Sequence, residues 1–323
     1  MNKHLTAVAF LLSFLSTSAS FSQSTQLLHL SDTVPRLELR YLHTFFNDGQ
    51  QDYAISTMHK NPFYSATYEV AFSYPLNKAL FLSASLPFSY TEYEMSIIDL
   101  GYGGYGYSDG DVGRGGYGGY VGDPLFLNET SYDHSEQAWG NIMLGLTYNK
   151  TYAKARKLQV QGQLFIPTAS RGKSNSVWNM AARNMTEFFR YANNTTTVLT
   201  KVLYGTQQAQ GWNYAISGGF YYTLTGTQAP VGDDLFMNYS LGGSYHFKNL
   251  AASCEFIGAA IVTEDSDNYD DFFDRTLNSA NLGLHYTKGA FIPCIFYSTY
   301  LRANIREELP GILGVKLSYR FGK

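Results

Sequence analysis

Amide and ionisable side chains recur at every second position in several segments of the chain, an arrangement that could hold water and guide polar solutes. Glutamine occupies positions 159, 161 and 163. Alternate side chains of a strand point to opposite faces, so these three glutamines share one face. The residues that alternation assigns to such an inward polar face are Arg40, Glu69, Gln159, Gln161, Gln163, His246, Glu255, Lys316 and Arg320, together with Glu38, Lys201, Asn238 and His285.

This polar face carries both signs of charge. Ionisable groups inside a membrane protein face water or one another, and they commonly mark a pathway. A lining of mixed sign would not repel anions or cations as a class. The alternative is a set of salt-bridged side chains that fills a small barrel, and the residues alone leave both interpretations open.

Histidine could take part in catalysis as the base of a Ser–His or Asp–His pair. His43, His246 and His285 lie in strand-like segments, and Asp133-His134-Ser135 lies in a predicted loop. Their surroundings lack the spacing of outer-membrane phospholipase or protease signatures. We therefore predict no catalytic residue, and the chain also lacks the ligand spacing of a zinc site, so neither a metal nor a cofactor is predicted.

The elements that must position these side chains are segments of about ten residues in which apolar and polar residues alternate. Many such segments favour an all-β, antiparallel transmembrane barrel of the outer membrane over a soluble β-sandwich, which has shorter strands and less unequal loops. The predicted strands are 37–45, 65–74, 79–94, 139–149, 158–166, 195–205, 211–224, 234–247, 250–262, 279–287, 291–301 and 312–321.

Connection lengths predict about twelve strands, with ten or fourteen as alternatives. Bacterial barrels have short periplasmic turns, long outer loops and an even number of strands. The weakest strand is 195–205, because it follows a stretch, 180–191, that could form a short helix. Without that strand the count would be odd and the acidic loop would fall in the periplasm. With both termini periplasmic, the long loops are 46–64, 95–138, 167–194 and 263–278.

The first residues have the layout of a secretory signal. A basic start, Met1-Asn2-Lys3-His4, precedes an apolar run at 5–15 that is too short to span a membrane as a helix. We predict a signal peptide at 1–22, a single barrel domain at 23–323 and localisation in the cell outer membrane. The 27 Tyr and 22 Phe suit aromatic girdles at the membrane interfaces. A formal charge of -3 favours neither nucleic acid nor an acidic partner.

Two predicted outer loops have unusual compositions. The stretch 97–123 is rich in Gly and Tyr, but its Gly-x-Gly-x-x-Gly spacing lacks the strand and helix of a dinucleotide site. This loop could cover the barrel mouth, meet an external partner or bind nothing. The loop 263–278 is rich in Asp and could bind a cation, although a solvated acidic loop is the simpler interpretation.

Four short stretches carry a resemblance to a known family. They are the glycine-started strand GNIMLGLTY at 140–148, the LFIPT strand end at 164–168, the PVGD turn at 230–233 and the EFIG segment at 255–258. The region 139–321 resembles the outer-membrane transporter-like barrels grouped with phenol meta-degradation pathway proteins, the MetA type. It departs from them at Asn141, where the family has Asp, and at the two residues that follow the C-terminal aromatic. The resemblance implies passage of small, hydrophobic or aromatic compounds.

Together these features predict a barrel for passive or facilitated passage of small solutes, and not an enzyme. The alternative is a non-conducting surface barrel that binds an external partner through its Gly/Tyr-rich loop. The expected partners are outer-membrane lipid, the barrel-assembly machinery and a small-molecule solute, with no nucleic acid. Whether residues 23–36 plug the barrel is left open.

Overall fold

The computed structural model describes the strands and most of the short connections of the chain. The described residues are 34–45, 58–99, 128–152, 155–169, 189–192, 194–225, 234–263, 276–302, 306 and 310–322. In the strand residues 58–63, 93–99 and 128–134 only the backbone is described. The predicted signal peptide, most of the Gly/Tyr-rich loop and residues 264–275 of the acidic loop lie outside these ranges. Among the described residues, no helix is long and apolar enough to cross a membrane.

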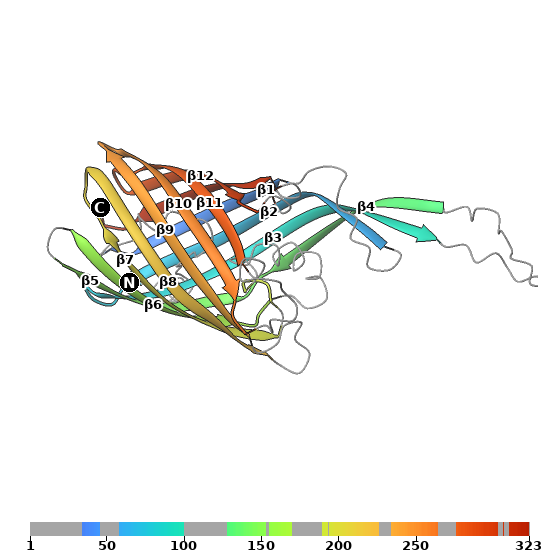
Figure 1. The fold of residues 1–323 in the computed structure, drawn as a ribbon, viewed down its shortest axis with the longest axis horizontal. Coiled ribbons are helices and arrows are strands. Elements are labelled where there is room, and N and C mark those ends of the chain that lie inside the picture. Colours follow the sequence, from blue (N-terminus) through green and yellow to red (C-terminus); the bar gives the residue numbers. More distant parts are fainter. Residues whose placement is uncertain are drawn as a thin grey trace, which may run out of the picture.

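Thirteen antiparallel strands form one sheet that closes on itself (Figure 1). The strands are β1 (Arg36–Phe45), β2 (Met58–Pro75), β3 (Leu80–Asp99), β4 (Asn128–Trp139), β5 (Ile142–Thr151), β6 (Arg156–Ile166), β7 (Thr195–Thr206), β8 (Gly211–Thr225), β9 (Leu235–Phe247), β10 (Leu250–Ile261), β11 (Thr276–Tyr286), β12 (Phe291–Tyr300) and β13 (Gly311–Arg320).

The sheet has thirteen strands, but the closed wall has twelve. Strands β4 and β5 lie one after the other along β3, and together they occupy one position in the wall. Strand β3 pairs with β5 at its beginning and with β4 further on, and Gly140 and Asn141 lie between the two partners. The wall closes where β1 pairs with β13, from Arg36 opposite Arg320 to Phe45 opposite Gly311. The predicted all-β, twelve-strand antiparallel barrel is therefore confirmed, including the weakly supported strand at 195–205.

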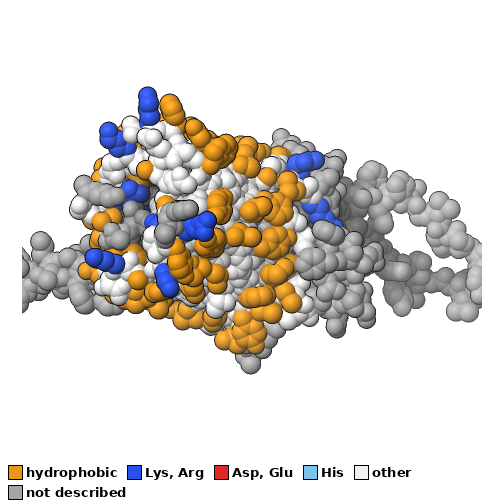
Figure 2. All heavy atoms as spheres, turned by 60° about the vertical axis from the view of Figure 1, so that its left-hand side comes forward, with side chains coloured by type: hydrophobic (Ala, Val, Ile, Leu, Met, Phe, Trp, Pro, Cys, Tyr) orange, Lys and Arg blue, Asp and Glu red, His pale blue; other side chains and the backbone are white. Residues whose placement is uncertain are grey.

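The two faces of the wall differ as the alternation predicts. On β6, Val160 and Leu164 are exposed, whereas the three glutamines between and beside them are buried. The outer surface carries a broad band of hydrophobic side chains, with Lys and Arg gathered near its edges (Figure 2). Lipid therefore meets an apolar surface, while polar side chains are enclosed by the barrel.

Leu241 lies midway along β9 with 59% of its side chain exposed, and Trp212 lies at the start of β8 with 73% exposed. We expect Leu241→Arg to lower the free energy of unfolding by about 2–4 kcal/mol and Trp212→Arg by about 0–1 kcal/mol, because the cost of a lipid-facing charge depends on depth. Urea unfolding in lipid vesicles measures both. Equal losses at the two positions would contradict a membrane-spanning band.

The structure corrects two predicted loops. Strand β2 begins at Met58, inside the predicted loop 46–64, and the predicted loop 95–138 contains the end of β3 and all of β4. The extended parts of β2, β3 and β4 project beyond the barrel on the side opposite the short turns (Figure 1). The segment 128–139 is mostly polar, so it has no apolar face by which alternation could identify a strand.

The structure also divides the predicted strand 139–149 between two strands. Its first residue, Trp139, is the last residue of β4, and the pairing is interrupted at Gly140 and Asn141 before β5 begins. Cys254 on β10 is exposed and Cys294 on β12 is buried, and no disulfide joins them.

Candidate functional site

The structure places the predicted polar-face residues on strands all around the barrel. Arg320 lies near the end of β13 and is half-buried. The others have side chains enclosed by the wall, and so do Glu38, Lys201, Asn238 and His285. The buried members of the predicted set are Arg40, Glu69, Gln159, Gln161, Gln163, His246, Glu255 and Lys316.

Two arginines converge on Glu69 in the interior. Arg40 Nη2 on β1 lies 2.7 Å from Glu69 Oε2 on β2, and Arg190 Nη1 lies 2.8 Å from Glu69 Oε1. All three side chains are at most 2% exposed. The sequence predicted Arg40 and Glu69 as residues of the inward polar face. It did not identify Arg190, which follows a long connection and does not belong to a strand.

Arg190 belongs to an inward-folded segment, Phe189–Ala192, which we call the crossing segment. Its four residues are buried, at 0–2% exposure. Asn141 holds the segment against the wall, because its Nδ2 donates to the carbonyl oxygens of Phe189 at 3.0 Å and Ala192 at 2.9 Å. The Oδ1 atom of Asn141 accepts a hydrogen bond from the Ala169 N–H at 2.9 Å.

The interruption between β4 and β5 makes room for this segment. A Cβ atom on Gly140 would lie 2.5 Å from the Arg190 carbonyl oxygen and 2.6 Å from Pro87 Cγ. A side chain at position 140 would therefore collide with the crossing segment. A Gly-Asn pair inside a strand-like stretch was the one signal in the sequence, since glycine within a strand often marks a bulge or a close backbone approach.

The side chain of Phe189, next to Arg190, packs in an aromatic cluster. Its ring stacks on Tyr221 of β8 with centroids 4.2 Å apart and meets Phe236 of β9 edge-on at 5.0 Å. Phe165 of β6 completes the aromatic set, and Met143 and Leu199 pack with it. The side chains of the crossing segment thus contact both the β6–β9 side of the barrel, through Phe189, and Glu69 on β2, through Arg190.

Other interior charges have partners as well. The carboxylate of Glu255 on β10 acts electrostatically on the ammonium of Lys201 on β7. Glu38 Oε1 lies 3.1 Å from Arg36 Nη1 and accepts a hydrogen bond from Ser318 Oγ at 2.9 Å. Acidic side chains of the interior are therefore matched with basic or hydroxyl groups, whereas basic residues are more numerous at one end.

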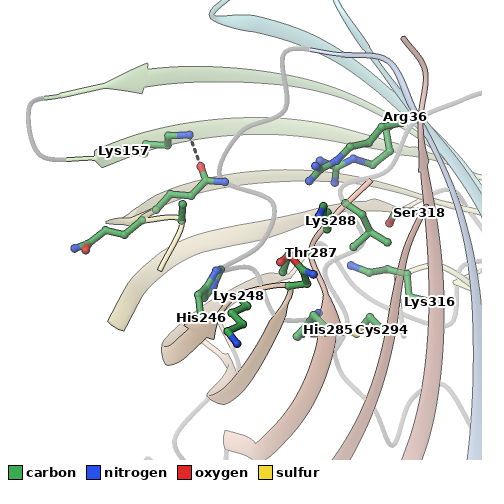
Figure 3. Close-up of a pocket in the computed structure, with 16 residues that line it drawn as sticks. Arg36, Lys157, His246, Lys248, His285, Thr287, Lys288, Cys294, Lys316 and Ser318 are labelled. Atoms are coloured by element: carbon green, nitrogen blue, oxygen red, sulfur yellow. Dashed lines mark hydrogen bonds between the residues drawn. The ribbon is translucent and has the colours of Figure 1, made fainter. Parts of the chain in front are cut away.

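That end contains a cavity of about 530 Å³. It lies where the short connections at 207–210, 248–249 and 287–290 meet the start of β1 and the end of β13. Figure 3 shows Lys157, Arg36 and Lys316 extending from different strands toward the same space. Its basic and histidine lining residues are Arg36, Lys157, His246, Lys248, His285, Lys288, Lys316 and Arg320.

His285 in the wall of this cavity lies next to Ser253, with Ser253 Oγ 3.0 Å from His285 Nε2, as in part of a catalytic Ser–His arrangement. A nucleophile of this kind needs a base whose other nitrogen is oriented by a third group. His285 Nδ1 is buried without a hydrogen-bond partner among the described residues. The residues that the structure describes contain no cluster of His, Cys, Asp or Glu suited to a metal ion.

No family model and no curated protein matches the chain. An outer membrane channel from Pseudomonas putida F1 matches with a TM-score of 0.53 and 11% identity, over 95% of this chain and 100% of that one. The NanC porin matches with a TM-score of 0.44 and 9% identity, over 89% and 100%. The P. putida toluene transporter TodX matches with a TM-score of 0.43 and 11% identity, over 96% and 100%. The first of these likenesses shows that the chain has the fold of an outer-membrane β-barrel.

Proposed function

We propose that the barrel passes small solutes across the outer membrane and that the crossing segment controls this passage. The observation that carries the proposal is the interior itself: a closed wall encloses buried polar side chains from nearly every strand. Intramembrane ionisable groups are costly unless they are paired or meet water, and they commonly mark solute routes. The residues proposed to line the route are Arg40, Glu69, Gln159, Gln161, Gln163, His246, Glu255, Lys316 and Arg320.

The crossing segment supports a controlled route rather than a wide, open pore. It is fixed at both sides of the interior, through Glu69 and through the aromatic rings around Phe189. A solute must pass beside this segment or displace it. The aromatic cluster around Phe189 is buried, and it would offer apolar contacts to a hydrophobic or aromatic solute that displaces the crossing segment.

Single-channel recording in a planar lipid bilayer tests the proposal. We expect the wild-type protein to show small discrete steps and Phe189→Ala to show larger ones, because that substitution removes the ring that anchors the crossing segment. Phe291→Ala, on the outer face of β12 with 58% exposure, is the matched control and should leave the steps unchanged. Insertion of all three proteins without any conductance would contradict the proposal.

A second candidate function is binding of an external partner by a closed barrel. The observation that favours it is the arm formed by β2, β3 and β4, which extends beyond the wall and carries the two ends of the Gly/Tyr-rich loop (Figure 1). A non-conducting barrel, including the Phe189→Ala form, would favour this function over passage.

A further inference from the structure

We propose that the cavity at the short-turn end of the barrel is a binding site for small soluble anions that carry carboxylate or phosphate groups. The inference rests on the proposed function only in assigning a role to the bound anion, which would be a solute using the route. Binding itself does not require conduction. In bacterial barrels the short-turn end faces the periplasm, so the site would lie at the periplasmic mouth.

The lining of the cavity is rich in positive charge. Six of the lining residues are Lys or Arg, and none is Asp or Glu within the described part of the chain. Glu38 is the nearby acid that offsets one of them, through its contact with Arg36. Among the described residues the lining therefore carries more basic than acidic side chains, in a recess partly walled by protein, where field lines are concentrated and anions accumulate.

Hydrogen-bond donors from several strands point into the same cavity. The guanidinium and ammonium groups of Arg36, Lys157 and Lys316 approach the cavity from three sides (Figure 3). Thr287 adds a hydroxyl group to the lining, whereas the Ser318 hydroxyl already donates to Glu38. Charge-assisted hydrogen bonds from such donors are shorter and stronger than neutral ones, and they suit the oxygens of carboxylates and phosphates.

His285 contributes a buried polar atom to the wall of the cavity. His285 is 1% exposed, and its Nε2 already contacts Ser253 Oγ. Its Nδ1 has no hydrogen-bond partner among the described residues. Burial of a polar nitrogen without a partner is unfavourable, so a small movement of the wall that lets an anion oxygen or its water reach Nδ1 would be favoured.

The charges deeper in the barrel are arranged differently, which limits the anion site to the mouth. Glu69 and Glu255 bring negative charge to the interior beside Arg40, Arg190 and Lys201. The excess of positive charge is therefore a local property of this cavity rather than a property of the whole lining.

The test is the line broadening of the ³¹P resonance of inorganic phosphate by the folded full-length protein in a neutral detergent. The variant Lys248→Gln/Lys288→Gln removes two exposed lining charges at the turns. The matched control, Lys78→Gln/Lys150→Gln, removes two exposed lysines that do not line the cavity, and Lys150 rests over Tyr152 as Lys248 rests over Phe247.

We expect the wild-type protein to broaden the resonance, the lining variant to reduce the effect about twofold, and the control to match the wild type. Broadening should weaken at 1 M KCl, where the Debye length falls to about 3 Å. Equal loss in both variants, or no broadening by the wild type, would overturn the inference. Broadening by a protein that never conducts would uphold the anion site and reject only the proposed passage.

Discussion

Glu69→Gln is expected to raise single-channel conductance severalfold and to lower the free energy of unfolding by about 3–5 kcal/mol. The carboxylate of Glu69 is the counter-charge of both Arg40 and Arg190 in the barrel interior. Glutamine has nearly the same shape but no charge, so two buried guanidinium groups would then face each other without it. Arg190 would be driven from its place, and the crossing segment would move with it.

The control for this experiment is Glu255→Gln, which also removes a carboxylate that is 2% exposed in the interior. Glu255 interacts with Lys201, which lies on β7 and not in the crossing segment. This variant should lose stability without a comparable rise in conductance. If both variants conduct equally, the effect of Glu69→Gln comes from general loosening of the barrel rather than from release of the crossing segment.

Asn141→Ala is expected to release the backbone of the crossing segment from the barrel wall. The substitution removes the donor to the carbonyl oxygens of Phe189 and Ala192 and the acceptor of the Ala169 N–H. Each buried backbone group left without a partner costs about 1–3 kcal/mol. We therefore expect a lower midpoint of urea unfolding and noisier, larger conductance steps in planar bilayers.

Asn213→Ala provides a closely matched comparison. Asn213 is 2% exposed, and its side chain accepts from the Gln208 N–H at 2.6 Å and donates to the Gln208 carbonyl oxygen at 3.1 Å. It therefore fixes backbone as Asn141 does, but at a short turn at the opposite end of β8 from Tyr221. Stability should fall in both variants, and conductance should rise in Asn141→Ala alone; unchanged conductance in both would separate Asn141 from any control of passage.

The barrel could be predicted from sequence because its main determinant is local. Alternation along a strand such as β6 indicates directly which side chains meet lipid and which are enclosed. Connection lengths indicate whether the number of strands is even or odd. The limits of β7 and β8 in the structure differ from the predicted 195–205 and 211–224 by a single residue at their ends.

The crossing segment could not be predicted because its contacts join parts of the chain that are far apart. Arg190 gains its partner on β2 and Phe189 gains its partners on β8 and β9 only when the barrel has closed. The stretch 180–191 was interpreted as a possible short helix, and the structure describes a turn at 189–191, with 180–188 outside the described residues. Local propensity contains no information about a partner across the interior.

The distribution of charge along the barrel also could not be predicted from the sequence. The inward face was predicted to be of mixed sign, which is correct as a composition. Strand register and turn positions decide that basic side chains gather around one cavity while Glu69 and Glu255 lie with their own basic partners. A list of inward residues does not reveal this segregation.

The closing seam between β1 and β13 has a consequence for how the barrel can form. Every other pairing of the described wall joins strands that are neighbours along the chain or are separated only by β4. Ser318 and Glu38, which touch across the seam, are 280 positions apart. Hairpins can therefore assemble one after another from local contacts, while the seam requires both ends of the domain to be present at once. Loss of either terminal strand would leave an open sheet with two unpaired edges in the membrane, where each unsatisfied backbone group is costly.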